Sequence, residues 1–252
     1  MESRHPRRAI GSIERVVYDE PTRCPYLPGR LARLPLRLPG RSLSGEELSD
    51  RLNSGDRRQG HFLYRPACPA CQACEAIRVD TVTFRPSKTQ RRVFRRGEAS
   101  LETVIDRPSA TPAKIALYNR HKIERGLVLG HDLVDASGYE EFLVASCADT
   151  IELSYHLNGK LIGVALADRA ADALSAVYCF FDPAYQRLSP GVYSVLKQVA
   201  LCRYWGLPWL YLGLYIADCP SMSYKARYVP HERLIAGAWH RFEDSSEARA
   251  GS

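Results

Sequence analysis

Stretches in which apolar and polar residues alternate predict the strands of this chain. HFLYR and CEAIRVDTVTF alternate with a period of two on either side of a cysteine-rich segment, and three further strand-like segments follow one another closely in the second half. Asn158-Gly159 separates the first two of those three and is typical of a type I′ hairpin turn. The expected strands cover residues 61–65, 74–84, 101–105, 150–157, 160–168, 174–181, 209–216 and 233–242.

Capping signals and glycines delimit the expected helices. A hydroxyl residue followed three positions later by Glu or Gln, the spacing of a capping box, occurs three times. These pairs are Ser44 with Glu47, Ser87 with Gln90, and Ser137 with Glu140. The expected helices lie at 45–54, 88–96, 112–125, 138–147 and 192–205, four of them ended by Gly55, Gly97, Gly126 and Gly206. Antiparallel strands followed by a strand–loop–helix–strand unit and a last strand predict an α+β acyltransferase layout with a mixed sheet.

The composition limits the class of protein. The chain has 252 residues, of which 45% are hydrophobic, which is enough for two domains. We expect these domains at 15–98 and 99–242. A basic flexible arm is expected at 1–20 and a polar, disordered tail at 243–252. No apolar run approaches the ~20 residues of a membrane span, and the charged start lacks the apolar segment of a signal peptide. We therefore expect a cytoplasmic protein without a membrane partner, whose cysteines stay reduced.

Positive charge is concentrated in one expected helix and one loop. The net charge of +7 favours a polyanionic partner. In the helix SKTQRRVFRRG the cations form one stripe, and the helix has no acidic residue to pair with them. The phosphates of a nucleic-acid backbone would neutralise such a stripe. These residues are Lys88, Arg91, Arg92, Arg95 and Arg96. The Pro- and Gly-rich segment 27–40 reads as a second basic region, an extended loop with Arg30, Arg33 and Arg37, followed by Arg41. The alternative is a solvated basic surface without a partner.

The cysteine run is the strongest motif. Cys68, Cys71 and Cys74 have the spacing C-x2-C-x2-C, which is typical of ligands to zinc or to a 4Fe-4S cluster. A fourth ligand is needed, and Cys24, followed by proline, is the first candidate, with His61 the next. Packing in an apolar core is the alternative for such cysteines. It suits the isolated Cys147, Cys179 and Cys202, and we expect Cys219 to be structural as well.

The loop before the long second-half helix has a partial likeness to a phosphate-binding loop. Gln186 to Gly191, QRLSPG, resembles the pyrophosphate loop of GCN5-type N-acetyltransferases, in which backbone N–H groups at a helix N-terminus hold the phosphates. Pro190 removes one such donor and Tyr193 adds bulk where the coenzyme would lie. We therefore expect no coenzyme A, although a coenzyme A-dependent N-acetyltransferase remains an alternative.

Six segments taken together resemble the aminoacyl-tRNA–protein transferases of the N-degron pathway. These are the eukaryotic arginyltransferases and the bacterial aspartate/glutamate leucyltransferases. The matching segments, spread over positions 24 to 230, are RCPYLPGR, HFLYRPACPACQAC, FRPSKTQRRVFRR, LSAVYCFFDP, GVYSVLKQ and LPWLYLGLYIADCPSMSYKARYVP. The resemblance implies a cysteine-bearing N-terminal domain and a GCN5-like (GNAT) catalytic domain. It also implies transfer of an amino acid from aminoacyl-tRNA to the N-terminal Asp or Glu of acceptor proteins, which marks them for proteolysis.

The donor amino acid is less strongly indicated than the reaction. The bacterial leucyltransferases usually read YLGYW where this chain reads YLGLYI, and the following DCPSMSYK is closer to the CPKMRYK of the arginyltransferases. The chain is short, however, as the bacterial enzymes are. We therefore expect leucine as the donor, with arginine as the alternative.

Candidate active-site residues follow from this reaction. An aminoacyl ester is already activated, so direct attack by an amine requires positioning, oxyanion donors and a proton for the leaving ribose hydroxyl. No catalytic triad or metalloprotease motif is present. We expect Tyr178, Tyr215, Tyr224 and Lys225 to be catalytic, and Arg227, Gln186, Gly191 and Tyr193 to bind substrate. The alternatives are half-buried packing for the tyrosines and, for the whole chain, a noncatalytic RNA-binding module.

Overall fold

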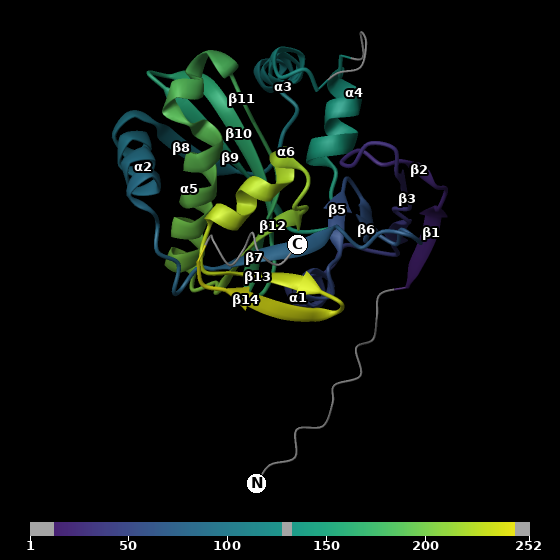
Figure 1. Ribbon diagram of the computed structural model, residues 1–252. Coiled ribbons are helices and arrows are strands. Elements are labelled where there is room, and N and C mark those ends of the chain that lie inside the picture. Colours follow the sequence, from purple (N-terminus) through teal and green to yellow (C-terminus); the bar gives the residue numbers. More distant parts are fainter. Residues whose placement is uncertain (1–12, 128–132, 245–252) are drawn as a thin grey trace.

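The computed structural model describes residues 13–127 and 133–244, with helices around one large sheet and a smaller sheet beside it (Figure 1). The strands are β1 (Glu14–Tyr18), β2 (Thr22–Arg23), β3 (Leu31–Ala32), β4 (Leu36–Pro39), β5 (Arg57–Gln59), β6 (Phe62–Tyr64), β7 (Glu75–Asp80), β8 (Glu102–Asp106), β9 (Thr150–Leu157), β10 (Lys160–Arg169), β11 (Ala173–Phe181), β12 (Trp209–Tyr215), β13 (His231–Ile235) and β14 (Ala238–Phe242). The helices are α1 (Gly45–Asn53), α2 (Lys88–Ser100), α3 (Pro112–Glu124), α4 (Ala136–Tyr139), α5 (Pro190–Trp205) and α6 (Pro220–Ser223), with the short segments η1 (Glu140–Val144), η2 (Pro183–Leu188) and η3 (Tyr224–Arg227).

The large sheet is mixed, which confirms the predicted α+β class. Its order is β14-β13-β7-β12-β11-β10-β9-β8, and all neighbouring strands are antiparallel except β11 and β12. Asn158 and Gly159 have φ values of 50° and 76°, as a type I′ turn requires, so the predicted β9–β10 hairpin is confirmed.

Helices cover both faces of this sheet (Figure 1). Ala165 points into a core with Tyr193 of α5 on one face, whereas its neighbours Val164 and Leu166 point into a second core with Tyr118 of α3. Successive side chains of a strand point to opposite faces, so β10, which is buried along most of its length, packs against both helical layers. None of the helices in the described ranges is long and apolar enough to cross a membrane.

Helices α2 and α5 approach each other unusually closely at one glycine. A Cβ added to Gly97 would lie 2.1 Å from the Tyr193 ring, so only glycine fits there. The sequence predicted that the helix ends at Gly97. In the structure it continues to Ser100. The glycine serves packing and not chain termination.

The N-terminal half contributes to both sheets. Strands β1, β4, β6 and β5 form the smaller sheet, and the cysteine run leads from β6 directly into β7. Strand β7 pairs with β12 and β13 near the centre of the large sheet. Residues on both sides of the expected boundary at residue 98 thus share one sheet, so the two halves are joined by backbone hydrogen bonds.

Several predicted elements differ from the structure. Part of the expected flexible arm is strand β1, which pairs with β4. Asp135, not Ser137, accepts from the first turn of α4 and therefore caps it. The last expected strand is a hairpin, β13–β14, because Ala236 and Gly237 take positive φ values and reverse the chain. The expected disordered tail lies outside the described residues from 245 onward.

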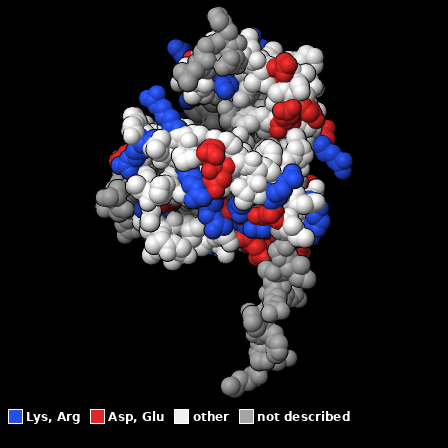
Figure 2. Space-filling model, turned by 90° about the vertical axis from the view of Figure 1, so that its right-hand side faces the viewer, with Lys and Arg blue, Asp and Glu red and all other residues white. Residues whose placement is uncertain are grey.

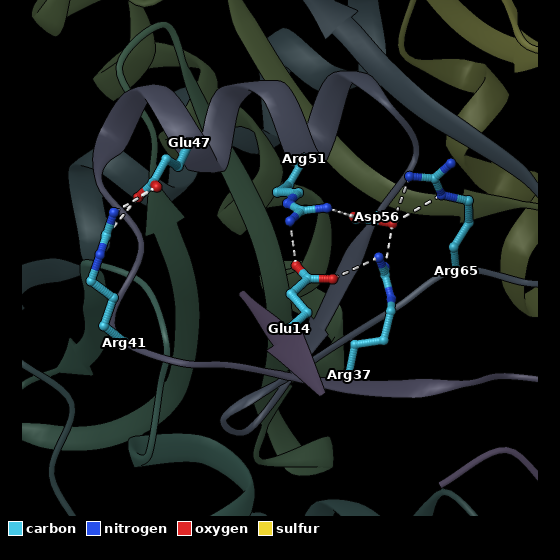
Figure 3. Close-up of polar contacts among 7 residues, drawn as sticks. All are labelled: Glu14, Arg37, Arg41, Glu47, Arg51, Asp56 and Arg65. Carbon is cyan, nitrogen blue, oxygen red and sulfur yellow. Dashed lines mark hydrogen bonds and ion pairs between the residues drawn. The ribbon is translucent and has the colours of Figure 1, made fainter. Parts of the chain in front are cut away.

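Ion pairs neutralise most of the arginines that made segment 27–41 look basic. Arg33 binds Asp19, Arg37 binds Glu14 and Asp56, and Arg41 binds Glu47. Figure 3 shows Arg37 between the two carboxylates, with Arg51 and Arg65 completing the network. On the side where β1 to β3 lie, Lys and Arg are mixed with Asp and Glu (Figure 2). This part of the chain is therefore not the uniformly basic surface that its sequence suggested.

Candidate active site

The two parallel strands at the centre of the sheet separate at their carboxyl ends. Strands β11 and β12 pair only over Ala173–Ser175 and Trp209–Tyr211, although β11 continues to Phe181 and β12 to Tyr215. Beyond the paired residues the two strands diverge. We call this region the β11/β12 split. Ligands of open sheets typically bind beyond the carboxyl ends of parallel strands, so the split is the natural place for a site.

Two buried cations hold the end of β12. Arg57 donates from Nη2 to the carbonyl of Gly213 at 2.7 Å, and Lys225 donates from Nζ to the carbonyl of Leu214 at 2.6 Å. The register of β12 against β7 shifts between Tyr211 and Leu214, and Gly213 has a φ of 84°. Side chains thus bind carbonyls at this irregularity. Because Arg57 belongs to β5, the small sheet helps to shape the split.

Lys225 has a strongly altered basicity. It is 7% exposed, and burial, reinforced by the nearby Arg57 charge and opposed by Cys219, lowers the pKa of Lys225 to about 7. A lysine with this pKa is neutral in a large fraction of molecules at neutral pH. It is therefore able to accept a proton, which an ordinary lysine is not.

Tyr178 and Tyr224 stand on opposite sides of the split. The Tyr178 ring on β11 packs 5.8 Å from the rings of Tyr118 and Phe142. Tyr224 begins η3, beyond the end of β12, and as a whole residue is 40% exposed. Desolvation is the main cause that raises the pKa of both tyrosines, and the guanidinium of Arg125 opposes the rise in each. Both hydroxyls stay protonated at neutral pH, and that of Tyr178 is hydrogen-bonded to Tyr118.

Tyr215 lies in different surroundings. Its ring is 4.6 Å from the guanidinium of Arg233, which is fully buried and also covers Phe242 at 3.8 Å. In register, Tyr215 pairs with Glu75, the residue that follows the cysteine run. The structure thus places Tyr178, Tyr224 and Lys225 around the split, whereas the Tyr215 ring contacts the β13–β14 hairpin.

The loop before α5 presents little of what a phosphate-binding loop needs. Gln186 is exposed, Ser189 has a positive φ of 56°, and a Cβ at Gly191 would meet Phe181 at an ordinary 3.7 Å. Tyr193 is fully buried, and its hydroxyl bonds Glu98 at 2.7 Å and Thr103 at 3.0 Å. The Tyr193 side chain is thus occupied by packing between α5, α2 and β8.

The basic stripe of α2 is exposed as expected. Lys88, Arg91, Arg92, Arg95 and Arg96 all face solvent, and within the described ranges none of the five has an ion-pair partner. Arg227 is exposed as well, and its carbonyl accepts from Gln90 of α2 at 3.3 Å. This contact places η3, which carries Tyr224 and Lys225, next to the basic helix.

The four cysteines of the predicted centre lie near one another. Cys24, Cys71 and Cys74 pack in one cluster with Ile216 and Cys219, and Cys68 lines the same recess as Cys71 and Cys74. Burial and then the neighbouring thiols raise the pKa of Cys74. Three N–H groups point at sulfur: Leu27 to Cys24 and Arg33 to Cys68, each at 3.4 Å, and Arg30 to Cys71 at 3.2 Å. In the described part of the chain, no three His, Cys, Asp or Glu side chains are arranged to hold a metal ion.

Arg57 and Arg125 were not among the residues singled out from the sequence. Arg57 lies in RRQ, a strand of three residues without an apolar position, so no alternation marked it as buried. Arg125 ends the amphipathic helix α3, which carried no recognisable motif. Both acquire their positions from the sheet topology, which the local pattern does not contain.

Comparisons with known proteins identify relatives for both halves. Residues 22–92 match the family described as arginine-tRNA-protein transferase, N terminus, and residues 113–235 match its C terminus. The chain is 41% identical over 220 residues to the aspartate/glutamate leucyltransferase of Chromobacterium violaceum, covering 87% of this chain and 90% of the relative. For the enzymes of the same name from Thiobacillus denitrificans and Acinetobacter baumannii the identities are 38% and 34%, covering 87% and 97% of this chain and 91% and 90% of each relative.

Solved structures give weaker matches. The C-terminal domain of a putative lysylphosphatidylglycerol synthetase from Agrobacterium fabrum aligns with a TM-score of 0.44 at 15% identity, covering 67% of this chain and 51% of that one. FemX aligns with a TM-score of 0.42 at 11% identity, covering 72% of this chain and 63% of that one.

The family matches and the curated relatives show that the protein is a transferase enzyme. The chain belongs to the arginine-tRNA-protein transferase family, whose two halves it matches in order.

Proposed function

We propose that this protein transfers leucine from leucyl-tRNA to the N-terminal Asp or Glu of acceptor proteins in the cytoplasm, which marks them for N-degron-dependent proteolysis. The observation that carries the proposal is the identity of 34–41% to aspartate/glutamate leucyltransferases over 87–97% of the chain. The family match covers the segments that form the split and the first turn of the basic helix.

The reaction proceeds by direct aminolysis. The acceptor α-amine, with an ordinary pKa of about 7.7–8.0, attacks the ester carbonyl of the aminoacyl-tRNA. A C–N bond forms, the C–O bond to the terminal ribose breaks, and one proton moves from the amine to the ribose oxygen. In the proposed site the protonated hydroxyls of Tyr178 and Tyr224 donate to the oxyanion of the tetrahedral intermediate.

Lys225 accepts the proton of the attacking amine in this proposal. Its pKa of about 7 suits a group that must bind and release a proton near neutral pH. Its contact with the Leu214 carbonyl holds it at the end of β12. Arg57 donates to the carbonyl of Gly213 and so helps to position the same end of β12.

The tRNA approaches the split from the side of α2. The unpaired cations of α2 neutralise phosphates, and Arg227 continues the basic surface toward η3 because its backbone is bonded to Gln90. This route brings the aminoacylated end of the tRNA to Tyr224 and Lys225. We place the GCN5-like acyltransferase function in the α3–β14 part of the fold without coenzyme A, because Pro190 at the start of α5 lacks one of the backbone N–H donors that a pyrophosphate would need.

We further propose that Cys24, Cys68, Cys71 and Cys74 hold zinc or a 4Fe-4S cluster. Thiolates are the ligands that both groups prefer, and N–H groups directed at three of the sulfurs suit thiolate ligands. Bound there, the group would link the segment around Cys24 to the β6–β7 connection and stabilise the fold. The reaction steps above do not involve it.

A donor and acceptor matrix tests the proposed function. The purified protein is incubated with radiolabelled Leu-tRNA or Arg-tRNA and peptides that begin with Asp, Glu or Ala. We expect label from Leu-tRNA on the Asp and Glu peptides only. Label transferred from Arg-tRNA alone would show that the donor amino acid is arginine and not leucine. Label on no peptide would refute the proposal.

A further inference from the structure

One face of α3 borders the β11/β12 split on the side away from the basic helix. Tyr118, His121 and Arg125, spaced at three and seven residues, follow one stripe of the helix toward the end of β11. The Tyr118 ring lies 5.3 Å from Phe180, and His121 bonds the backbone of Phe181 through Nδ1. Arg125, the C-cap residue, has its guanidinium 5.9 Å from the Phe181 ring. The stripe thus ends in a cation at the mouth of the split.

The Arg125 guanidinium has no carboxylate partner in residues 13–127 and 133–244, and the residue is exposed. The guanidinium lies 5.9 Å from the ring of Phe181, the last residue of β11, so Arg125 stands at the carboxyl end of that strand. Its charge also opposes, as a smaller cause than burial, the raised pKa of Tyr178 and of Tyr224. Arg120, one turn earlier, differs because it is bonded to Asp182 at 2.9 Å.

Two other cations near the split, Lys225 and Arg227, have different surroundings from Arg125. Lys225 is buried, and its Nζ is bonded to the Leu214 carbonyl. Arg227 is attached to α2 through Gln90 and lies on the side from which we propose that the tRNA approaches. Arg125, on the α3 side, makes no ion pair within residues 13–127 and 133–244 and so offers its donors to a ligand at the mouth.

We propose that Arg125 binds the side-chain carboxylate of the acceptor's N-terminal Asp or Glu and thereby determines acceptor specificity. The assignment rests on the proposed function and adds to it the residue that reads the acceptor. The planar guanidinium fork matches a carboxylate through two parallel N–H···O bonds. An N-terminal Asn or Gln has the same shape but no charge, and Ala has no acceptor group. Tyr178 precedes Phe181 on the same strand, so a carboxylate held by Arg125 directs the acceptor α-amine toward the split.

The test is the ratio of kcat/KM for an Asp peptide to that for an otherwise identical Asn peptide, measured with Leu-tRNA. We expect wild type to prefer Asp by about tenfold or more, as a charge-assisted pair requires. Arg125→Gln should lower this ratio to near one by slowing the Asp peptide only. Arg125→Lys should keep most of the preference, and Arg125→Glu should favour a Lys peptide over the Asp peptide. Arg107→Gln, an exposed cation before α3, is the matched control and should behave as wild type.

The ratio is measured within one variant, so a reduced amount of folded protein cancels. An unchanged Asp/Asn ratio in Arg125→Gln would overturn the assignment of Arg125 while leaving the proposed transfer intact. A wild type that transfers leucine to no peptide would instead overturn the proposed function, and the role of Arg125 with it.

Discussion

At the scale of single residues, Lys225 connects the fold to the proposed chemistry. Burial beside Arg57 lowers its pKa to about 7, whereas in the unfolded chain the pKa is near 10.5. Between these two values the unfolded chain holds a proton that the folded chain has released. The contribution of Lys225 to the free energy of unfolding therefore rises with pH from about 7 to 10.5, and its unfavourable burial is felt in full below pH 7.

Replacing Lys225 by Met tests both consequences. We expect kcat for transfer to fall by about a hundredfold or more, because the proton acceptor is lost, while tRNA affinity stays the same. In chemical denaturation, the stability of wild type relative to K225M should rise between pH 7 and pH 10. A difference in stability that does not change over this range would show that Lys225 is not titrating there, and a normal kcat would remove it from the reaction.

At the scale of elements, the contact between α2 and α5 depends on the missing side chain of Gly97. We expect Gly97→Ala to destabilise the protein by roughly 1–3 kcal/mol through overpacking against Tyr193. Gly191→Ala is the matched control, since its Cβ would find ordinary contact distance at a negative φ. Thermal unfolding monitored by circular dichroism measures both variants, and equal Tm values for the two would contradict the packing described here.

The basic stripe is the second element with a measurable role. Charge reversal of Arg91, Arg92 and Arg95 together should weaken tRNA binding and reduce the slope of log Kd against log salt by roughly 2 to 3, because each phosphate contact on a duplex contributes about 0.9. Reversal of Arg107, an exposed cation outside α2, shows the effect of one charge reversal away from the stripe. If the slope of the triple variant equals that of wild type, α2 is a solvated face and the tRNA binds elsewhere.

At the scale of the whole molecule, the cysteine segment joins the two sheets through β6 and β7. We expect Cys24→Ser to reduce metal or cluster content and to lower the stability of the entire chain in one transition, because β7 is an interior strand of the large sheet. Iron, sulfide and zinc analysis after anaerobic purification measures the first effect, and calorimetry the second. Full metal occupancy in Cys24→Ser would exclude Cys24 as the fourth ligand. His61 would then be the next candidate for that position.

Local sequence patterns predicted most helices and strands but not which strands pair with one another in the sheet. The strand segments TIELSYHL and KLIGVALAD and the Asn158-Gly159 turn are local properties, and the structure confirms them. The place of β7 between β12 and β13 depends on pairing across more than a hundred residues, which alternation does not specify. The site follows the same division. A family likeness suggested Tyr178, Tyr224 and Lys225, whose catalytic roles stay predictions, whereas the positions of Arg57 and Arg125 depend on long-range packing that the local sequence does not contain.

The most direct test of direct transfer to an acidic N-terminus is single-turnover transfer from labelled Leu-tRNA to an Asp peptide, with the same peptide acetylated on its α-amine as the control. We predict that the free peptide gains one leucine on its α-amine, identified by tandem mass spectrometry, as the Leu-tRNA is consumed. The acetylated peptide should gain none. Equal consumption of Leu-tRNA with both peptides, or leucine attached anywhere but the α-amine, would contradict the account.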